Sequence, residues 1–307
     1  MRIHLDTDLG GDADDVAALA MLLGDPEVEI TGITVCTDNT GLRTALTRHV
    51  LGLAGRADIP VAGGGAGLLG MPPQTFATHD ARYFPAFDFR APIQRDQPGA
   101  ALDLLALSIE AGATVIAIGP FTNLAMLEAM RPGSLARAPL AVMGGYIGSP
   151  QPGYPQWPAA MDFNVQCDAV AARTVFEQAN PLITSLLVCM DVALESVDIA
   201  PLQAGGPLSQ LVALQAQVQF GESGFERLVA ENPSLPRGLL NFQWDPLACA
   251  AVLGWDCLTV SELPLALVER DGALAFEEQP GARPRRIVTA VDAPAFREQW
   301  LERVVRV

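Results

Sequence analysis

The sequence Asp6-Thr-Asp-Leu-Gly-Gly-Asp-Ala-Asp-Asp15 directly follows a short apolar stretch at residues 3–5, and it carries five carboxylates. Like charges at this density repel one another, and water screens them poorly where they are partly buried. A hard cation relieves the repulsion, and a set of oxygen ligands favours Ca²⁺ or Mg²⁺. We therefore expect a strand at 3–5, an apolar helix at 16–23 and a metal site between them.

Strand and helix patterns alternate along the rest of the chain. The predicted strands are 29–35, 114–118, 140–143 and 183–188, and the predicted helices are 42–53, 123–130 and 167–178. This alternation predicts an α/β fold with an open, mainly parallel (mixed) central sheet and helices on both faces. Ligands bind such sheets at the carboxyl ends of the strands. We expect one domain over residues 1–307, with helical additions between about 200 and 246.

Composition excludes several classes of protein. The formal charge of −16 argues against nucleic acid or an anionic membrane as a partner. All 19 basic residues are arginine, so Schiff-base chemistry and P-loop phosphate binding, which need lysine, are excluded. The five cysteines lack metal-binding spacing, and we see neither a leader nor a long apolar run. We therefore expect a cytoplasmic protein with reduced thiols.

Other interpretations explain the acidic stretch less well. An EF-hand loop beginning at Asp6 needs an oxygen ligand at its fifth position and glutamate at its twelfth, where this chain has Gly10 and Ala17. A phosphatase of the haloacid-dehalogenase type needs a catalytic lysine. Helix capping accounts for one or two aspartates but not for five.

The acidic stretch and several later motifs together resemble the inosine–uridine-preferring nucleoside hydrolases. That family begins with a strand, D-x-D-x-G and then D-D-x-x-A, which this chain has at 6–10 and 14–18. The later motifs are, in order, Asp38-Asn39, Gly119-Pro-Phe-Thr-Asn-Leu-Ala125, Met143-Gly-Gly145, Asp162-Phe-Asn164 with Asp168, and Trp244-Asp-Pro-Leu-Ala248. The segment between the first two motifs is two residues longer than the family's commonest form. Asp12 lies in it, and its role is open.

The resemblance implies a role for each matching residue. The implied metal ligands for Ca²⁺ are Asp8, Asp15, the backbone carbonyl of Thr122, and Asp245. The implied catalytic residues are Asp8, which takes a proton from the attacking water, Asn39 and Trp244. The implied substrate-binding residues are Asp14 at the ribose 2′-hydroxyl, Asn39, Asp162, Asn164, Trp244 and His79.

Two residues depart from the commonest pattern of the family. Asp162 stands where the family usually has glutamate, so its carboxylate reaches less far. Trp244 stands where many members have histidine, and in this it resembles a purine-specific branch whose tryptophans stack on the base. An aromatic partner for the other face of the base would come from the long loops at 63–98 or 149–158, which carry Tyr83, Phe84, Phe87 and Trp157, and the sequence does not select among these four.

The sequence therefore predicts a Ca²⁺-dependent enzyme that hydrolyses the N-glycosidic bond of ribonucleosides, purine nucleosides above all, to ribose and free base. The resemblance also implies a homodimer or homotetramer. Three alternatives stay open: a hydrolase of another N-riboside, a metal-dependent phosphohydrolase, and a non-catalytic nucleoside-binding protein. A binding protein would be expected to have lost Asp8 or Asp245, and both are present.

Overall fold

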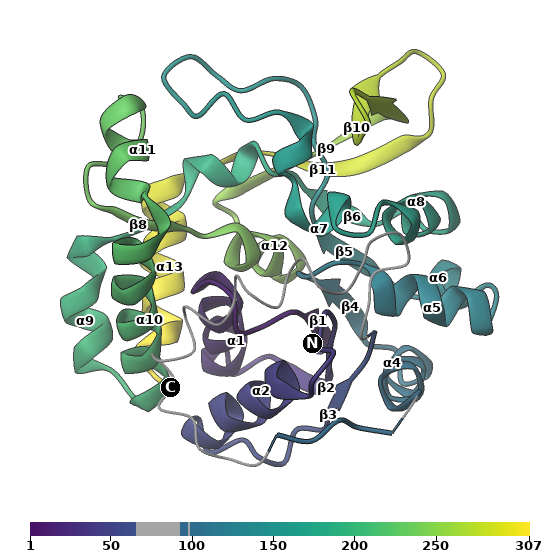
Figure 1. The fold of residues 1–307 in the computed structure, drawn as a ribbon, viewed down its shortest axis with the longest axis horizontal. Coiled ribbons are helices and arrows are strands. Elements are labelled where there is room, and N and C mark those ends of the chain that lie inside the picture. Colours follow the sequence, from purple (N-terminus) through teal and green to yellow (C-terminus); the bar gives the residue numbers. More distant parts are fainter. Residues whose placement is uncertain (66–92, 98) are drawn as a thin grey trace.

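The computed structural model describes residues 1–65, 93–97 and 99–307, and a nine-stranded sheet runs through it (Figure 1). Its strands are β1 (Arg2–Thr7), β2 (Glu29–Val35), β3 (Val61–Gly63), β4 (Thr114–Ala117), β5 (Leu140–Met143), β6 (Leu182–Thr184), β9 (Leu258–Arg270), β10 (Ala273–Glu278) and β11 (Pro284–Val291). Their spatial order is β10-β9-β11-β6-β5-β4-β1-β2-β3. Pairing is parallel from β3 to β11 and antiparallel at β9 and β10. The predicted mixed, mainly parallel sheet is confirmed.

Helices cover both faces of this sheet, as predicted. On one face lie α1 (Asp14–Gly24), α2 (Leu42–Leu53), α12 (Trp244–Leu253) and α13 (Ala293–Val304). On the other lie α4 (Ala100–Glu110), α5 (Thr122–Met130), α6 (Ser134–Arg137) and α8 (Ala169–Gln178). Each layer buries its own apolar core against the strands, which is how a parallel sheet loses its exposed faces.

The helical additions predicted between about 200 and 246 are present and lie outside α1 and α13 (Figure 1). They are α9 (Ile199–Ala204), α10 (Pro207–Ser223) and α11 (Phe225–Glu231). A small antiparallel pair, β7 (Ala193–Glu195) and β8 (Leu239–Phe242), brackets them. This pair returns the chain to the start of α12 and so to the sheet.

The prediction of a strand at 183–188 is wrong for the second half of that range. β6 ends at Thr184, and Val188–Asp191 forms a short 3₁₀ helix. Leu186 and Val188 are nevertheless buried in the core. A short apolar run satisfies a strand and a buried turn equally well, so hydrophobicity alone does not separate them.

Alternation along β1 divides the acidic stretch between the two faces of the sheet. Ile3 and Leu5 face the core beneath α1. Asp6 faces the other side, where it accepts hydrogen bonds from Thr34 and, at 2.8 Å, from Asn123 Nδ2 of α5. Burial raises the pKa of Asp6 to about 7, against the effect of these two donors. Asp6 therefore faces away from the aspartates at the start of α1, although the charge of Asp8 still raises its pKa.

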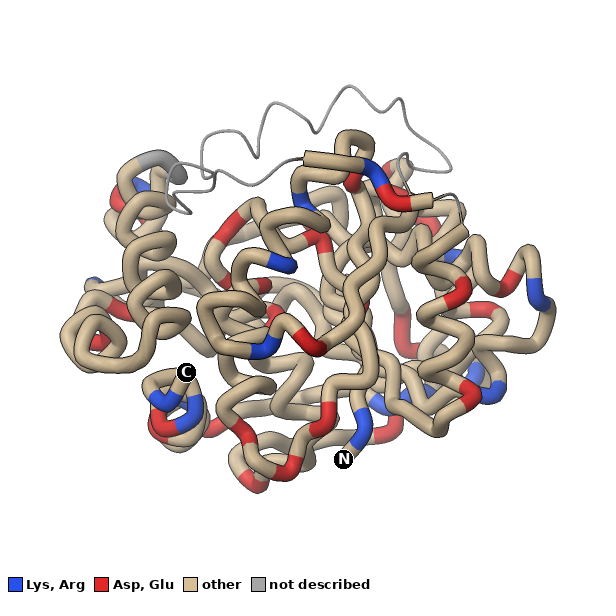
Figure 2. Tube along the Cα trace, turned by 90° about the horizontal axis from the view of Figure 1, so that it is seen from below, with Lys and Arg blue, Asp and Glu red and all other residues tan. Residues whose placement is uncertain are grey.

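Charged residues of both signs are spread over the chain, with arginines among the acidic residues (Figure 2). Within the part of the chain that the structure describes, no helix has the length and apolar character needed to cross a membrane.

Candidate active site

Residues 8–13 form the turn between β1 and α1. Gly10 has a φ of 122°, a left-handed conformation that favours glycine. The Thr7 hydroxyl accepts a hydrogen bond from the Leu9 N–H at 3.1 Å and donates one to Asp15. This hydroxyl therefore ties the first turn of α1 to the carboxyl end of β1.

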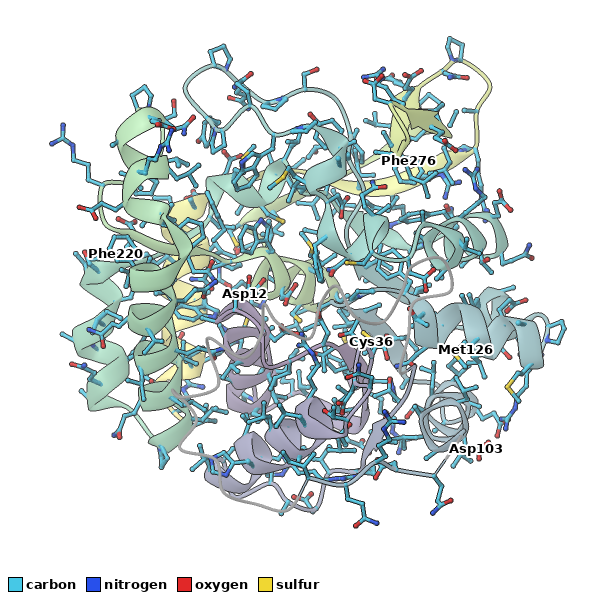
Figure 3. All side chains as sticks on the ribbon, in the orientation of Figure 1. Asp12, Cys36, Asp103, Met126, Phe220 and Phe276 are labelled. Carbon is cyan, nitrogen blue, oxygen red and sulfur yellow. The ribbon has the colours of Figure 1, made fainter. Side chains whose placement is uncertain are left out.

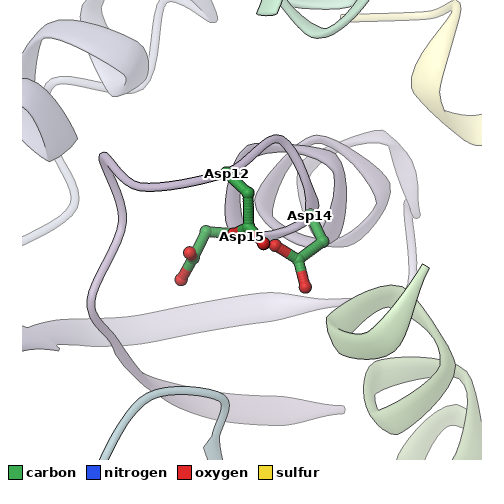
Figure 4. Close-up of side chains that lie close together, drawn as sticks. All are labelled: Asp12, Asp14 and Asp15. Carbon is green, nitrogen blue, oxygen red and sulfur yellow. The ribbon is translucent and has the colours of Figure 1, made fainter. Parts of the chain in front are cut away.

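Three carboxylates gather at the start of α1: those of Asp12, Asp14 and Asp15 (Figure 4). One oxygen from each lies within 4.8 Å of the others. Asp14 and Asp15 are buried, whereas Asp12 is half-buried. An all-oxygen donor set at this spacing suits a hard divalent cation. Of these three residues only Asp15 belongs to the predicted ligand set, whereas Asp14 is predicted to bind the ribose and Asp12 has no predicted role.

Asp245 joins the same group although it lies some 230 residues further along the chain. It stands in the first turn of α12, which packs against α1. Its carboxylate lies close to that of Asp14, and the charges of Asp15, Asp12 and Asp8 act on it. The fold therefore brings the late Trp-Asp motif to the early acidic motif, as the predicted ligand set requires.

Burial raises the pKa values of Asp14, Asp15 and Asp245 well above the ordinary range, and the charges of neighbouring aspartates raise them further. At Asp15, the Thr7 hydroxyl and the charge of Arg43 act in the opposite direction. Carboxylates in this environment hold either protons or a cation. Cation binding is therefore expected to compete with protonation.

Asp8 lies directly after β1 and is 8% exposed. Its Oδ2 is 3.9 Å from Nη1 of Arg43, a buried arginine on α2. A Cβ at Gly119 would stand 2.8 Å from both the backbone nitrogen and Oδ1 of Asp8. The glycine that opens the motif after β4 is thus required for this close approach.

Thr122, whose backbone carbonyl is a predicted metal ligand, begins α5 and is fully buried. Its hydroxyl donates to Asp168 at 2.7 Å, and Asp168 in turn accepts from the Ala171 N–H at 3.0 Å, at the start of α8. These bonds fix the first turn of α5 beside the carboxyl end of β4. The role of the Thr122 carbonyl stays a prediction.

Asn39 follows β2 and is half-buried. The preceding Asp38 accepts from the backbone N–H groups of Gly41 at 2.8 Å and Thr44 at 2.9 Å, which anchors the loop to α2. Thr37 has a φ of 52°, an uncommon conformation for a β-branched residue. Such strain is typical of loops at functional sites and persists only where the surroundings enforce it.

Asp162 and Asn164, two predicted ribose contacts, are both buried and both bind the backbone. Asp162 accepts from the Gly145 N–H at 2.6 Å and caps α7 (Phe163–Gln166) through Val165. Asn164 Nδ2 donates to the carbonyls of Ile118 at 2.8 Å and Met143 at 3.1 Å. Both residues therefore position the turns that follow β4 and β5, a structural role that the sequence did not reveal.

Trp244 begins α12 and is half-buried in an aromatic group. Its ring centroid is 5.1 Å from that of Phe242, and Trp157 packs edge-on against Phe242 at 5.7 Å. The indole Nε1 of Trp244 is buried and has no hydrogen-bond partner among the described residues. Of the four candidate partners for Trp244, Trp157 is among the described residues and packs against Phe242. Tyr83, Phe84 and Phe87 lie outside the described residues. His79 lies outside the described residues.

The sequence comparisons agree with this geometry. The family model described as inosine-uridine preferring nucleoside hydrolase matches residues 3–298, and the chain belongs to that family. It is 32% identical over 223 residues to the pyrimidine-specific ribonucleoside hydrolase RihA of Salmonella paratyphi A, with 69% of each chain covered. The chain is therefore an N-ribosyl hydrolase acting on the N-glycosidic bond of ribonucleosides.

The fold comparisons agree as well. A plant nucleoside hydrolase, PpNRh1, matches with a TM-score of 0.80 at 20% identity, over 99% of this chain and 98% of that one. A purine-preferring ribonucleoside hydrolase from Gardnerella vaginalis matches with a TM-score of 0.79 at 18% identity, over 99% and 98%.

Proposed function

We propose that the enzyme uses Ca²⁺ to hydrolyse ribonucleosides, with purine nucleosides preferred. The observation that carries the cation is the grouping of Asp14, Asp15 and Asp245 with Asp8 nearby, in which burial raises three carboxylate pKa values. A buried group of this charge costs free energy that a divalent cation offsets. Bound Ca²⁺ would neutralise the group and acidify a water molecule.

The chain's own residues then divide the chemistry. Asp8, Asp15, Asp245 and the Thr122 carbonyl would hold the cation, and Asp8 would accept the proton of the attacking water. Asp14 would accept a hydrogen bond from the ribose 2′-hydroxyl. The sugar is thereby held over the carboxyl ends of β1 and β4, where Asp8 and Thr122 lie.

Asn39 and Asn164 are the remaining proposed ribose contacts. Asn39 has a half-buried side chain, and Asn164 keeps its amide oxygen for a ligand because its Nδ2 is bound to two carbonyls. Asp162 is proposed with a narrower role. Its oxygens accept backbone N–H groups, so it would position the sugar site rather than reach far into it.

Trp244 supports the purine preference. Its half-buried ring lies beside Phe242, and a larger bicyclic base offers more surface for stacking than a pyrimidine does. Stacking would raise the basicity of the departing purine, so that solvent supplies the proton. The name of the Salmonella relative points to pyrimidines and that of the Gardnerella structure to purines, so base preference needs a direct test. The family resemblance also favours a homodimer or homotetramer in the cytoplasm.

The first test is a panel of ribonucleosides assayed for reducing sugar, in Ca²⁺ and in a chelator. Inosine, adenosine, guanosine, uridine, cytidine and nicotinamide riboside cover the proposed and alternative substrates. We expect ribose release from the purine nucleosides first, and none in the chelator. Faster release from uridine or cytidine would overturn the purine preference. Ribose release from nicotinamide riboside alone would favour the alternative function, a hydrolase of another N-riboside.

The second test concerns Trp244. Trp244→Ala should lower kcat for inosine by about tenfold, since stacking on one base is worth roughly 1–3 kcal/mol. Trp244→Phe should recover part of the loss, and Ca²⁺ binding should be unchanged in both variants. Trp255→Phe is the matched control, because Trp255 packs on Phe296 in another part of the core. Equal losses on inosine and uridine would assign Trp244 to packing alone.

A further inference from the structure

The turn around Asp12 is held from outside by the helix α10. Gln215 Nε2 donates to the Asp12 carbonyl at 2.6 Å, and a longer contact of 3.4 Å reaches the Gly11 carbonyl. Gln219 Oε1 accepts from the Ala13 N–H at 2.9 Å. The two glutamines are one helical turn apart, so they present from the same face of α10. The two shorter bonds therefore hold the same peptide group, the one that joins Asp12 to Ala13.

Both glutamines are buried to a degree that is unusual for this residue type. Gln215 is 0% and Gln219 is 3% exposed. Burying an amide costs free energy unless it gains hydrogen bonds. Gln215 Nε2 and Gln219 Oε1 gain theirs from the turn that carries Asp12, whereas Gln215 Oε1 is buried and has no hydrogen-bond partner among the described residues. Figure 3 shows Asp12 at the start of α1, on the side that faces α10 and α12.

Gln219 also supplies a cap that α1 lacks. Ala13 is the N-cap residue of α1 and has no side chain that accepts a hydrogen bond. In a capping box, a glutamate or glutamine three residues into the helix binds the N-cap N–H, but here that position is Val16. Gln219 makes this bond from another helix. It therefore fixes the entry into the helical turn that carries Asp14 and Asp15.

We propose that Gln215 and Gln219 are positioning residues for the turn at residues 11–13, and that by placing this turn they set how tightly the site binds its cation. The inference rests on the proposed function. It also gives a role to the two extra residues of the turn. The longer turn reaches α10, and α10 then holds Asp12 with a carboxylate oxygen within 4.8 Å of one of Asp14. Neither glutamine touches the reacting atoms.

The experiment is Ca²⁺ titration calorimetry on the full chain, with ribose release measured in parallel. Gln215→Leu and Gln219→Leu should each weaken Ca²⁺ binding by about fivefold, the equivalent of one hydrogen bond. Gln217→Leu is the control, because Gln217 is exposed on the same helix. Circular dichroism establishes that each variant is folded, and amide exchange over residues 11–15 in the cation-free protein should quicken only in the first two.

A charge-matched pair separates positioning from simple packing. Gln219 acts as an acceptor, so Gln219→Glu keeps the bond to Ala13 and should bind Ca²⁺ at least as tightly as the wild type. Gln215 acts as a donor, so Gln215→Glu loses its bond and should bind more weakly, although both variants add the same charge.

Equal behaviour of the two glutamate variants would overturn the inference, as would Ca²⁺ affinities in the leucine variants that match the wild type. In either case wild-type Ca²⁺ binding and ribose release stand unaffected. A wild type that neither binds Ca²⁺ nor releases ribose overturns the proposed function, and this inference with it.

Discussion

Two groups of buried aspartates lie within the same half of the sheet, and they differ in what their oxygens contact. Asp38 and Asp168 accept hydrogen bonds from backbone N–H groups and hydroxyls at the starts of α2, α5 and α8. Asp14 and Asp245 lie close to each other, and the strongest charges acting on them come from aspartates. Burial alone therefore does not identify a reactive carboxylate.

This difference indicates the role of each group of aspartates. Carboxylates that receive several donors are stabilised in place and hold loops to helices. Carboxylates that face one another are destabilised until a cation or proton arrives, which is a cost that a functional site bears. Asp162 shares a property with each group. It has two backbone donors, yet burial still raises its pKa to about 6.

The largest effect is expected from Asp8→Asn, which removes the proposed proton acceptor and a proposed cation ligand. We expect kcat to fall by at least about 100-fold, the usual loss for a general base. Ribose release per folded chain is the measurement, with Asp38→Asn as the matched control. An Asp8→Asn variant within tenfold of wild type would remove Asp8 from the catalytic group.

The dependence of stability on pH tests the environment of Asp162. Its folded pKa of about 6 lies above the unfolded value of about 3.9, so its contribution to stability is complete below about pH 3.9 and is lost as the pH rises through about 6. The stability of wild type minus that of Asp162→Asn should therefore fall by up to about 3 kcal/mol between pH 4 and pH 7. Urea unfolding at several pH values measures this. A flat difference would mean that Asp162 is ionised throughout.

Ca²⁺ should stabilise the folded enzyme, because it binds the group in which the charges of neighbouring aspartates raise the carboxylate pKa values. At a hundredfold excess over Kd the gain is about 2.7 kcal/mol, seen as a rise in Tm. Asp15→Asn and Asp245→Asn should lose most of this shift and keep or raise the Tm of the cation-free protein. A lower cation-free Tm in both would place these residues with the structural group.

The smallest effect is expected for Asp38→Ala, from the donor-rich group. Truncation leaves the N–H groups of Gly41 and Thr44 and the Thr44 hydroxyl without their acceptor. We expect a loss of about 2 kcal/mol in the free energy of unfolding. The Ca²⁺-induced rise in Tm should persist. If that rise disappears instead, the two groups are not separable.

Much of this arrangement could be predicted from sequence. The strands at 29–35 and 140–143 and the helix at 42–53 have the predicted bounds, because each is a periodic stretch flanked by clear turn residues. The family motif also predicted that Asp245 would meet Asp15. Local pattern cannot supply such a long-range contact, so that expectation came from the resemblance.

The remainder depends on tertiary packing that no local pattern encodes. Asp6 looked like part of the acidic cluster, but strand alternation sends it to the opposite face. The backbone contacts of Asp162 arise only once the turn after β5 is in place. Gln215 and Gln219 appear unremarkable in a helix until the fold brings them to the turn at residues 11–13.

The most direct test of the central claim is to strip the enzyme with a chelator and then titrate it with Ca²⁺, following cation binding and ribose release together. The account predicts tight binding of one ion per chain, no ribose release before Ca²⁺ is added, and release that rises in step with occupancy. Full ribose release from the stripped enzyme, or release that does not follow Ca²⁺ binding, would contradict it.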